Sequence, residues 1–285
     1  MKFTLSTFPP IGLVLLAVTS IQLGAGIATQ LFPVLGAEGT VAIRIIISAL
    51  LLSLAARGRI DTFGKILRKN MGLLLGFGLC IAAMNLFFYQ SIARIPLGAA
   101  VAFEFIGPLG VAAFSSRRKS HFAWIALAAL GILLLSPISG ADLDILGIFF
   151  ALLAGAGWAC FIILAGRVGK ATSGNDGLII GMIIAAAFMI PFAVPVTLDL
   201  ISNPLILLAS FGVALLSTTL PFRLEFEALK RIPTRTYGIL VSVEPAVAAL
   251  VGALLLGKRI GVQGVVAVTC VVVAAVGITV SDQQN

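Results

Sequence analysis

The sequence predicts an all-α polytopic membrane protein, with ten transmembrane helices arranged as two inverted five-helix repeats around a central cavity. Composition, the length of the apolar runs and an internal repeat lead to this fold class. Of the 285 residues, 60% are apolar and only 11% are charged, whereas a soluble domain has about 25% charged residues. Continuous apolar runs of about 20 residues are long enough to cross a bilayer as helices. Transmembrane β-strands would instead alternate in polarity over short segments.

The expected helices follow one another along nearly the whole chain. The first run is too long for the apolar region of a signal peptide, so we expect it to be the first transmembrane helix. The connections are short and leave no room for a soluble domain. The ten expected spans are 9–32, 37–56, 70–92, 96–115, 122–138, 144–166, 175–197, 204–227, 234–255 and 260–280.

Basic residues are concentrated in alternate connections. The side with the majority holds Lys2, Arg57, Arg59, Lys65, Arg68, Lys69, Arg117, Arg118, Lys119, Arg167, Lys170, Lys230, Arg231 and Arg235, and the other side holds Arg94, Lys258 and Arg259. Because Lys and Arg are enriched in cytoplasmic connections, we expect both termini in the cytoplasm. We attribute the net charge of +8 to the basic residues in these short connections and expect no nucleic-acid partner.

An internal repeat relates the two halves of the chain at an offset of 137 residues. The run at 94–96 recurs at 231–233, and a second proline follows twelve residues after the first one in both copies, as Pro108 and Pro245. Each half contains five spans, an odd number, so the second half is expected to be inserted in the opposite sense. Inverted repeats are characteristic of alternating-access transporters. Some channels also have them, so a passive pore remains an alternative.

Two acidic residues lie near the middle of the fourth and ninth expected spans, Glu104 and Glu244. The offset maps Glu104 to position 241, one helical turn from Glu244, so both carboxylates are expected to point toward one internal axis. An ionised side chain at membrane depth costs about 2.5–3.5 kcal/mol and normally faces protein or water. The pair is either a site for a substrate amine or a proton, or a pair of structural acids bonded to backbone freed by Pro108 and Pro245.

Other polar or amphipathic side chains at membrane depth complete the candidate substrate site. Asn85 and Tyr89 share one helix face, four residues apart. Glycines and prolines interrupt the first, third, fourth, sixth, eighth and ninth spans, which we expect to surround the cavity, whereas the second, seventh and tenth are more uniformly aliphatic and are expected at the periphery. The candidate substrate-binding residues are Gln22, Asn85, Tyr89, Glu104, Trp158, Tyr237 and Glu244. The alternative for each is helix–helix packing or hydrogen bonding.

Two arginines fall inside the expected helices. Arg44 is expected to have a structural role, capping carbonyls or pairing with an acid. Arg223 and Glu227 are four residues apart and are interpreted as an interfacial ion pair, with Arg223 extending toward water.

Signatures of enzyme chemistry are missing from the sequence. It contains no P-loop, no complete G-x-G-x-x-G and no H-E-x-x-H. The one histidine, His121, lies beside a basic connection, and the cysteines lie in apolar runs without metal-site spacing. We therefore expect no catalytic residues, no metal site and no cofactor.

Several strings, in order along the chain, resemble those of the drug/metabolite transporter superfamily, specifically EamA-type permeases of the threonine/homoserine exporter kind. The likeness extends from about residue 20 to residue 277. The strings are Ser20-Ile21-Gln22, Met84-Asn85, Phe88-Tyr89, Pro96-Leu97-Gly98, Glu104-Phe105, Gly107-Pro108-Leu109, Phe114-Ser115-Ser116-Arg117-Arg118, Gly155-Ala156-Gly157-Trp158-Ala159, Ser217-Thr218, Leu220-Pro221, Pro233-Thr234-Arg235-Thr236-Tyr237-Gly238 and Glu244-Pro245-Ala246.

The resemblance implies two inverted halves, 1–138 and 139–285, and export of amino acids or related metabolites across a bacterial inner membrane. The implied substrates are threonine, homoserine or other neutral or aromatic amino acids. The expected partners are this small-molecule substrate and membrane lipid, and two halves in one chain favour a monomer. One departure is Phe222-Arg223, where such exporters have Tyr-Ser. An exporter of drugs or nucleosides remains an alternative.

Overall fold

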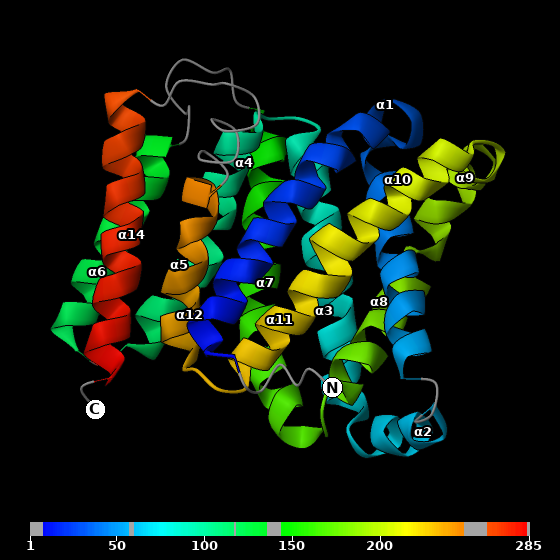
Figure 1. The fold of residues 1–285 in the computed structure, drawn as a ribbon, viewed down its shortest axis with the longest axis horizontal. Coiled ribbons are helices and arrows are strands. Elements are labelled where there is room, and N and C mark those ends of the chain that lie inside the picture. The colour runs from blue at the N-terminus through cyan, green and yellow to red at the C-terminus, as the bar shows by residue number, and fades with distance from the viewer. Residues whose placement is uncertain (1–7, 57–59, 117, 136–143, 248–260, 284–285) are drawn as a thin grey trace.

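The computed structural model describes residues 8–56, 60–116, 118–135, 144–247 and 261–283, and these form a bundle of helices without a strand (Figure 1). Seven of the described helices are long and apolar enough to cross a membrane, and two shorter apolar helices, Pro10–Ala25 and Lys119–Leu135, accompany them. The prediction of an all-helical membrane protein is therefore confirmed. Residues 136–138 of the fifth expected span and 248–255 of the ninth lie outside the described residues.

The helices follow the expected spans closely where the structure describes them. Their bounds are α1 Pro10–Ala55, α2 Ile60–Lys69, α3 Met71–Ile92, α4 Leu97–Glu104, α5 Ile106–Ser115, α6 Lys119–Leu135, α7 Ile145–Ala171, α8 Asp176–Ala193, η3 Val194–Val196, α9 Thr197–Ser202, α10 Pro204–Ala214, η4 Leu215–Thr219, α11 Leu220–Leu229, α12 Thr234–Leu240, η5 Val241–Val243 and α14 Val262–Gln283.

Helix α1 contains the first two expected spans and turns between them. Pro33 lies inside it, and Gly36 has φ 66° and ψ 174°, outside the helical region. A positive φ is accessible to glycine at little cost because glycine has no Cβ. Thr40 donates from Oγ1 to the Gly36 carbonyl at 2.6 Å, at the start of the second limb. Figure 1 shows the first limb rising from the N-terminal end, and the second limb returning toward α2.

Helix α2 is a correction to the sequence analysis, which expected a loop between the second and third spans. Phe63 is buried, whereas Lys65, Arg68 and Lys69 are exposed. This amphipathic pattern is typical of a helix that lies along a membrane surface. Figure 1 shows α2 lying across the end of the bundle at which α1 begins. The expectation was wrong because the criterion was average hydropathy, which misses a short helix with one apolar face.

Three helical segments are interrupted near prolines. A proline lacks the N–H that would bond to the carbonyl four residues earlier. Helix α4 ends at Glu104, shortly before Pro108, and η5 ends at Val243, shortly before Pro245. The segment η4, a turn of π-helix, directly precedes the Leu220-Pro221 step. Such interruptions expose backbone groups and redirect side chains, and they are frequent at functional sites.

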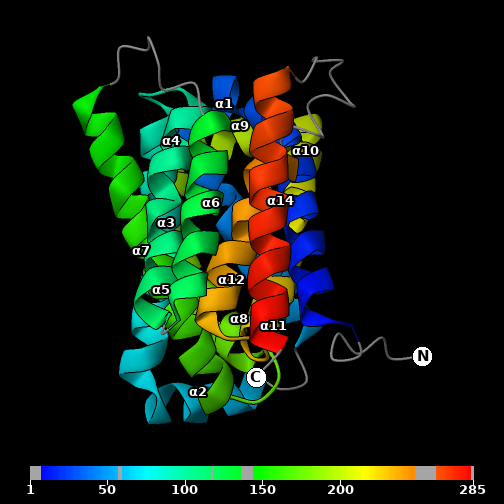
Figure 2. The ribbon, with the colours of Figure 1, turned by 90° about the vertical axis from the view of Figure 1, so that its left-hand side faces the viewer.

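Small residues fix how the broken helices pack against α7. A methyl group on Gly107 would lie 1.9 Å from the Gly155 carbonyl oxygen, and one on Gly155 would lie 2.5 Å from the Glu104 carbonyl oxygen. Backbone therefore contacts backbone where α4 and α5 meet α7, as small residues allow in membrane proteins. Elsewhere α3 packs on α7, and α6 and α14 lie side by side (Figure 2).

Candidate functional site

A cavity of about 380 Å³ lies within the bundle. All six spans expected to surround it contribute lining residues. Its polar side chains are Gln22, Arg44, Asn85, Tyr89, Glu104, Trp158, Ser217, Glu225 and Glu244, and the remaining surface is mostly apolar. An apolar chamber with a few polar groups is typical of a small-molecule site.

Most of the candidate residues meet in this cavity. Those that line it are Gln22, Asn85, Tyr89, Glu104, Trp158 and Glu244. Tyr237 is fully buried and is not among the lining residues. The structure thus brings together six side chains from α1, α3, α4, α7 and the segment after η5.

Arg44 was expected to cap carbonyls or pair with an acid, and its second span was expected at the periphery. Instead, the second limb of α1 places Arg44 at the cavity, with only 8% of the residue exposed. Its Nη1 donates to Ser217 Oγ at 3.2 Å, and its Nη2 donates to Asn85 Oδ1. Its guanidinium carbon lies 4.9 Å from the centre of the Tyr89 ring. Among the described residues it makes no direct ion pair with a carboxylate, although Glu104 interacts with it electrostatically across the cavity.

The π-helical turn η4 holds Ser217 in front of Arg44. Two of its neighbouring carbonyls accept bonds from serines of α1: Ser20 Oγ donates to Leu216 at 2.6 Å, and Ser48 Oγ donates to Ala214 at 2.9 Å. Gly24 permits the close approach, because a methyl group there would lie 2.8 Å from the Ser217 Cβ. Backbone groups exposed by the irregular turn are thus satisfied by side chains, as burial requires.

The acidic residues of the cavity come from three helical segments. Gln22 Nε2 on α1 donates to Glu244 Oε1 at 3.1 Å, joining the two halves of the chain. Glu104 ends α4, and Glu225 on α11 is 4% exposed. The Trp158 ring packs edge-on against Phe105, with centroids 5.0 Å apart. The cavity therefore combines three carboxylates, one guanidinium and an aromatic wall.

Glu225 was missed as a site residue, although the repeat contained a signal for it. The offset of 137 carries Asn85 onto Phe222 and Phe88 onto Glu225, and all four residues line the cavity. Arg223, the departure noted in the sequence, is not among the lining residues. The expected ion pair between Arg223 and Glu227 was wrong, because Glu227 pairs with Lys230 and Arg231.

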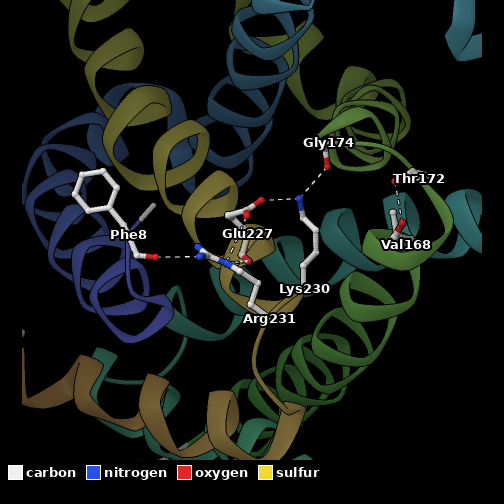
Figure 3. A network of polar contacts seen from close by, with 7 residues as sticks. All are labelled: Phe8, Val168, Thr172, Gly174, Glu227, Lys230 and Arg231. Carbon is white, nitrogen blue, oxygen red and sulfur yellow. Dashed lines mark hydrogen bonds and ion pairs between the residues drawn. The ribbon is translucent and has the colours of Figure 1, made fainter. Parts of the chain in front are cut away.

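A second charged group, the rim cluster of Glu227, Lys230 and Arg231, lies at the end of α11 (Figure 3). Lys230 Nζ lies 2.5 Å from Glu227 Oε2, and Arg231 Nε lies 3.4 Å from Glu227 Oε1. Lys230 also donates to the Gly174 carbonyl at 3.0 Å, and Arg231 donates to the Phe8 carbonyl at 2.9 Å. The rim cluster therefore ties α11 to the start of α1 and to the connection between α7 and α8.

The apolar helical bundle, its interrupted helices and its central polar cavity define a membrane transporter. Residues 145–280 match the EamA-like transporter family. The chain is 42% identical over 280 residues to the threonine/homoserine exporter RhtA of Salmonella typhimurium (strain LT2), covering 97% of this chain and 93% of that protein. It is 40% identical over 279 residues to RhtA of Escherichia coli (strain K12), with the same coverage. This chain belongs to the EamA-like transporter family.

The fold is also similar to a crystal structure of a protein with 17% sequence identity. The TM-score is 0.75, and the match covers 96% of this chain and 98% of the other. The family and the fold together identify a multi-pass membrane transporter that acts on a small molecule and is not an enzyme.

Proposed function

We propose that this chain exports amino acids, with threonine and homoserine first among the neutral or aromatic amino acids and related metabolites. The observation that supports this most is the cavity, which presents carboxylates and a guanidinium to the same apolar chamber. A free amino acid has one positive and one negative group, so it needs both signs when it leaves water. The exporters named above are 40–42% identical to this chain over nearly its whole length.

The proposed architecture has ten transmembrane helices in two inverted halves, 1–138 and 139–285. The pairs of cavity-lining residues that the offset of 137 relates support it: Ile21 with Trp158, Asn85 with Phe222, and Phe88 with Glu225. Equivalent positions on the two halves thus face one central space, as expected for an inverted repeat.

Alternating access is proposed to use contacts at the two ends of the cavity. Arg94 bonds to the Gln90 carbonyl at 2.8 Å and lies 4.0 Å from Asp144, just before α7. Its repeat equivalent, Arg231, approaches the Glu227 carbonyl at 3.3 Å and bonds to Phe8, just before α1. The offset carries Gln90 onto Glu227 and the first span onto the sixth. Opening one contact while the other stays closed would expose the cavity to one side at a time.

Within the cavity, Glu104, Glu225 and Glu244 are proposed to neutralise the substrate ammonium. Gln22 would hold Glu244 in place. Trp158 and Tyr89 would supply an amphipathic wall, and buried Tyr237 would support that wall from behind.

The chain is proposed to act as a monomer in a bacterial inner membrane, without a cofactor and with both termini in the cytoplasm. The asymmetry of basic residues supports this orientation. Helix α1 begins and α14 ends at the same end of the bundle (Figures 1 and 2), which fits an even number of crossings.

Counterflow tests the proposal. Proteoliposomes preloaded with unlabelled threonine are expected to accumulate labelled threonine or homoserine saturably, and protein-free liposomes are not. Flux that rises linearly with concentration would indicate a pore instead. If folded protein exchanges no amino acid in a full panel, the assignment fails, and drugs and nucleosides become the substrates to test.

A further inference from the structure

In the part of the chain that the structure describes, Arg44 lines the cavity without a direct ion pair, and one of its N–H donors also has no acceptor. Arg44 is 8% exposed, and its Nε has no hydrogen-bond partner among the described residues. An arginine side chain has five N–H donors, and its two recorded hydrogen-bond acceptors, Asn85 and Ser217, are both neutral. Three carboxylates line the same cavity and Glu104 interacts electrostatically with Arg44, but among the described residues none of them makes a direct ion pair with its guanidinium. A buried guanidinium without a directly bonded anion is unfavourable.

The two neutral partners are themselves held in position. Asn85 Nδ2 donates to the Ile81 carbonyl at 2.8 Å, which leaves its Oδ1 to accept from Arg44. Ser217 Oγ donates to the Val213 carbonyl at 2.7 Å and accepts from Arg44 Nη1. The guanidinium is therefore fixed by acceptors that cannot neutralise it, and its buried Nε has no acceptor among the described residues. A guanidinium binds a carboxylate best through two parallel N–H bonds.

The two amide side chains that line the cavity already donate to groups of the protein. Gln22 donates to Glu244, and Asn85 donates to Ile81. Three other basic side chains among the described residues have carboxylate partners: Lys230 and Arg231 share Glu227, and Arg94 lies near Asp144. Arg44 lines the cavity without such a partner.

We propose that Arg44 binds the α-carboxylate of the transported amino acid through the N–H groups of its guanidinium, opposite the acids that receive the ammonium. This inference rests on the proposed function and makes it more specific. It defines the substrate class as free α-amino acids, and it excludes amides, esters and amines that lack a carboxylate. Arg44 is then a specificity-determining residue, and the substrate carboxylate supplies the directly bonded anion that Arg44 lacks within the protein.

The test is competition against threonine counterflow in proteoliposomes. In the wild type, unlabelled threonine and homoserine are expected to inhibit uptake of labelled threonine, and L-threonine amide, which keeps the ammonium and side chain, is expected to inhibit about tenfold less or weaker still. In Arg44→Gln, the apparent affinity for threonine is expected to fall about tenfold or more, and the preference over the amide is expected to disappear. Arg44→Lys keeps the charge but loses the two-pronged geometry, so an intermediate preference is expected.

The matched control is Arg167→Gln, which makes the same change at an exposed position on the last turns of α7 and should match the wild type. The preference between threonine and its amide is a ratio within one protein, so the amount of folded variant does not affect it. The analogue series on the wild type tests the inference even if Arg44→Gln does not fold: equal inhibition by amide and acid would overturn it. An unchanged ratio in folded Arg44→Gln would overturn it as well. Exchange of no amino acid by the wild type would instead overturn the proposed function, and the Arg44 assignment with it.

Discussion

The cavity and the rim cluster accommodate buried or half-buried charge in opposite ways. At the rim, two cations share Glu227 and two backbone carbonyls, so every charge there has a partner within the protein. In the cavity, Arg44 has only neutral partners, and three carboxylates line the same chamber without an ion pair to it. The paired group joins segments, whereas the unpaired group is suited to a ligand that brings its own charges. Acidic and basic side chains thus join helices at the rim cluster, whereas in the cavity they are placed to bind a substrate.

Close backbone packing of α4 and α5 against α7 holds one side of the cavity in place, and Gly107→Ala would disrupt this packing. The added methyl group would overlap the Gly155 carbonyl, so the free energy of unfolding is expected to fall by about 3 kcal/mol. Transport should be lost with it, because α4 positions Glu104. Gly110→Ala is the control, because Gly110 lies in α5 with Gly107 and an added methyl group there would meet no atom within 4 Å. Thermal unfolding in detergent measures both, and equal stability of the two variants would contradict the packing argument.

Giving Arg44 an internal anion would turn the cavity into a second paired site. Asn85→Asp is nearly isosteric and places a carboxylate against the guanidinium. Threonine affinity is expected to fall about tenfold or more, because the substrate must then compete with a buried ion pair. Asn85→Leu removes the acceptor without adding a charge and should lower affinity much less. Counterflow across a range of threonine concentrations distinguishes the two, and normal affinity in Asn85→Asp would show that Arg44 has no role in binding.

Removing the shared anion of the rim cluster would test whether its paired charges serve closure and not substrate binding. Glu227 and Lys230 have side chains that are 15% and 18% exposed, so Glu227→Gln is expected to lower the free energy of unfolding by about 1 kcal/mol. The apparent affinity for threonine should not change, while the maximal rate should, because the contact between α11 and α1 is altered. A change in affinity with an unchanged rate would be the wrong pattern for a closing contact.

The smallest effect is expected at the opposite end of the molecule. Asp144→Asn removes the ion pair with Arg94, which spans 4.0 Å between side chains that are 32% and 48% exposed. The asparagine oxygen can still accept from the Leu146 N–H, as Asp144 Oδ1 does at 3.1 Å. Stability should therefore change by only a few tenths of a kcal/mol. Thermal unfolding measures this. A loss of stability as large as that of Glu227→Gln would mean that the ion pairs at the two ends contribute equally to stability.

Much of the fold was predictable from hydropathy, because lipid requires long apolar helices whatever the details of packing. Average hydropathy does not detect α2, because this short helix has only one apolar face and its mean hydropathy is low. The glycine and proline positions indicated which helices surround the cavity, since only small or interrupted segments allow close contact with the others.

The candidate site was predictable where one residue stood out from its own helix. Glu104 and Glu244 were found because an acid in an apolar run requires an explanation. The same argument applied to Arg44, but its uniformly aliphatic span suggested the periphery. Its true position follows from the turn at Gly36 and from the contact between Gly24 and Ser217, which depend on tertiary packing. Glu225 was missed because it lies in a charged helix end, where the sequence does not reveal which residue turns inward.

Substrate-dependent stabilisation tests the central claim most directly, namely that the cavity charges are balanced by the substrate and the rim charges by the protein. A ligand at 100 times its dissociation constant stabilises the folded state by about 2.7 kcal/mol. Near-saturating threonine should therefore raise the unfolding temperature of the wild type and of Glu227→Gln, and should raise that of Arg44→Gln much less, because a tenfold weaker affinity leaves at most about 1.4 kcal/mol of that stabilisation. An equal rise in Arg44→Gln, or a loss of the rise in Glu227→Gln, would contradict the account.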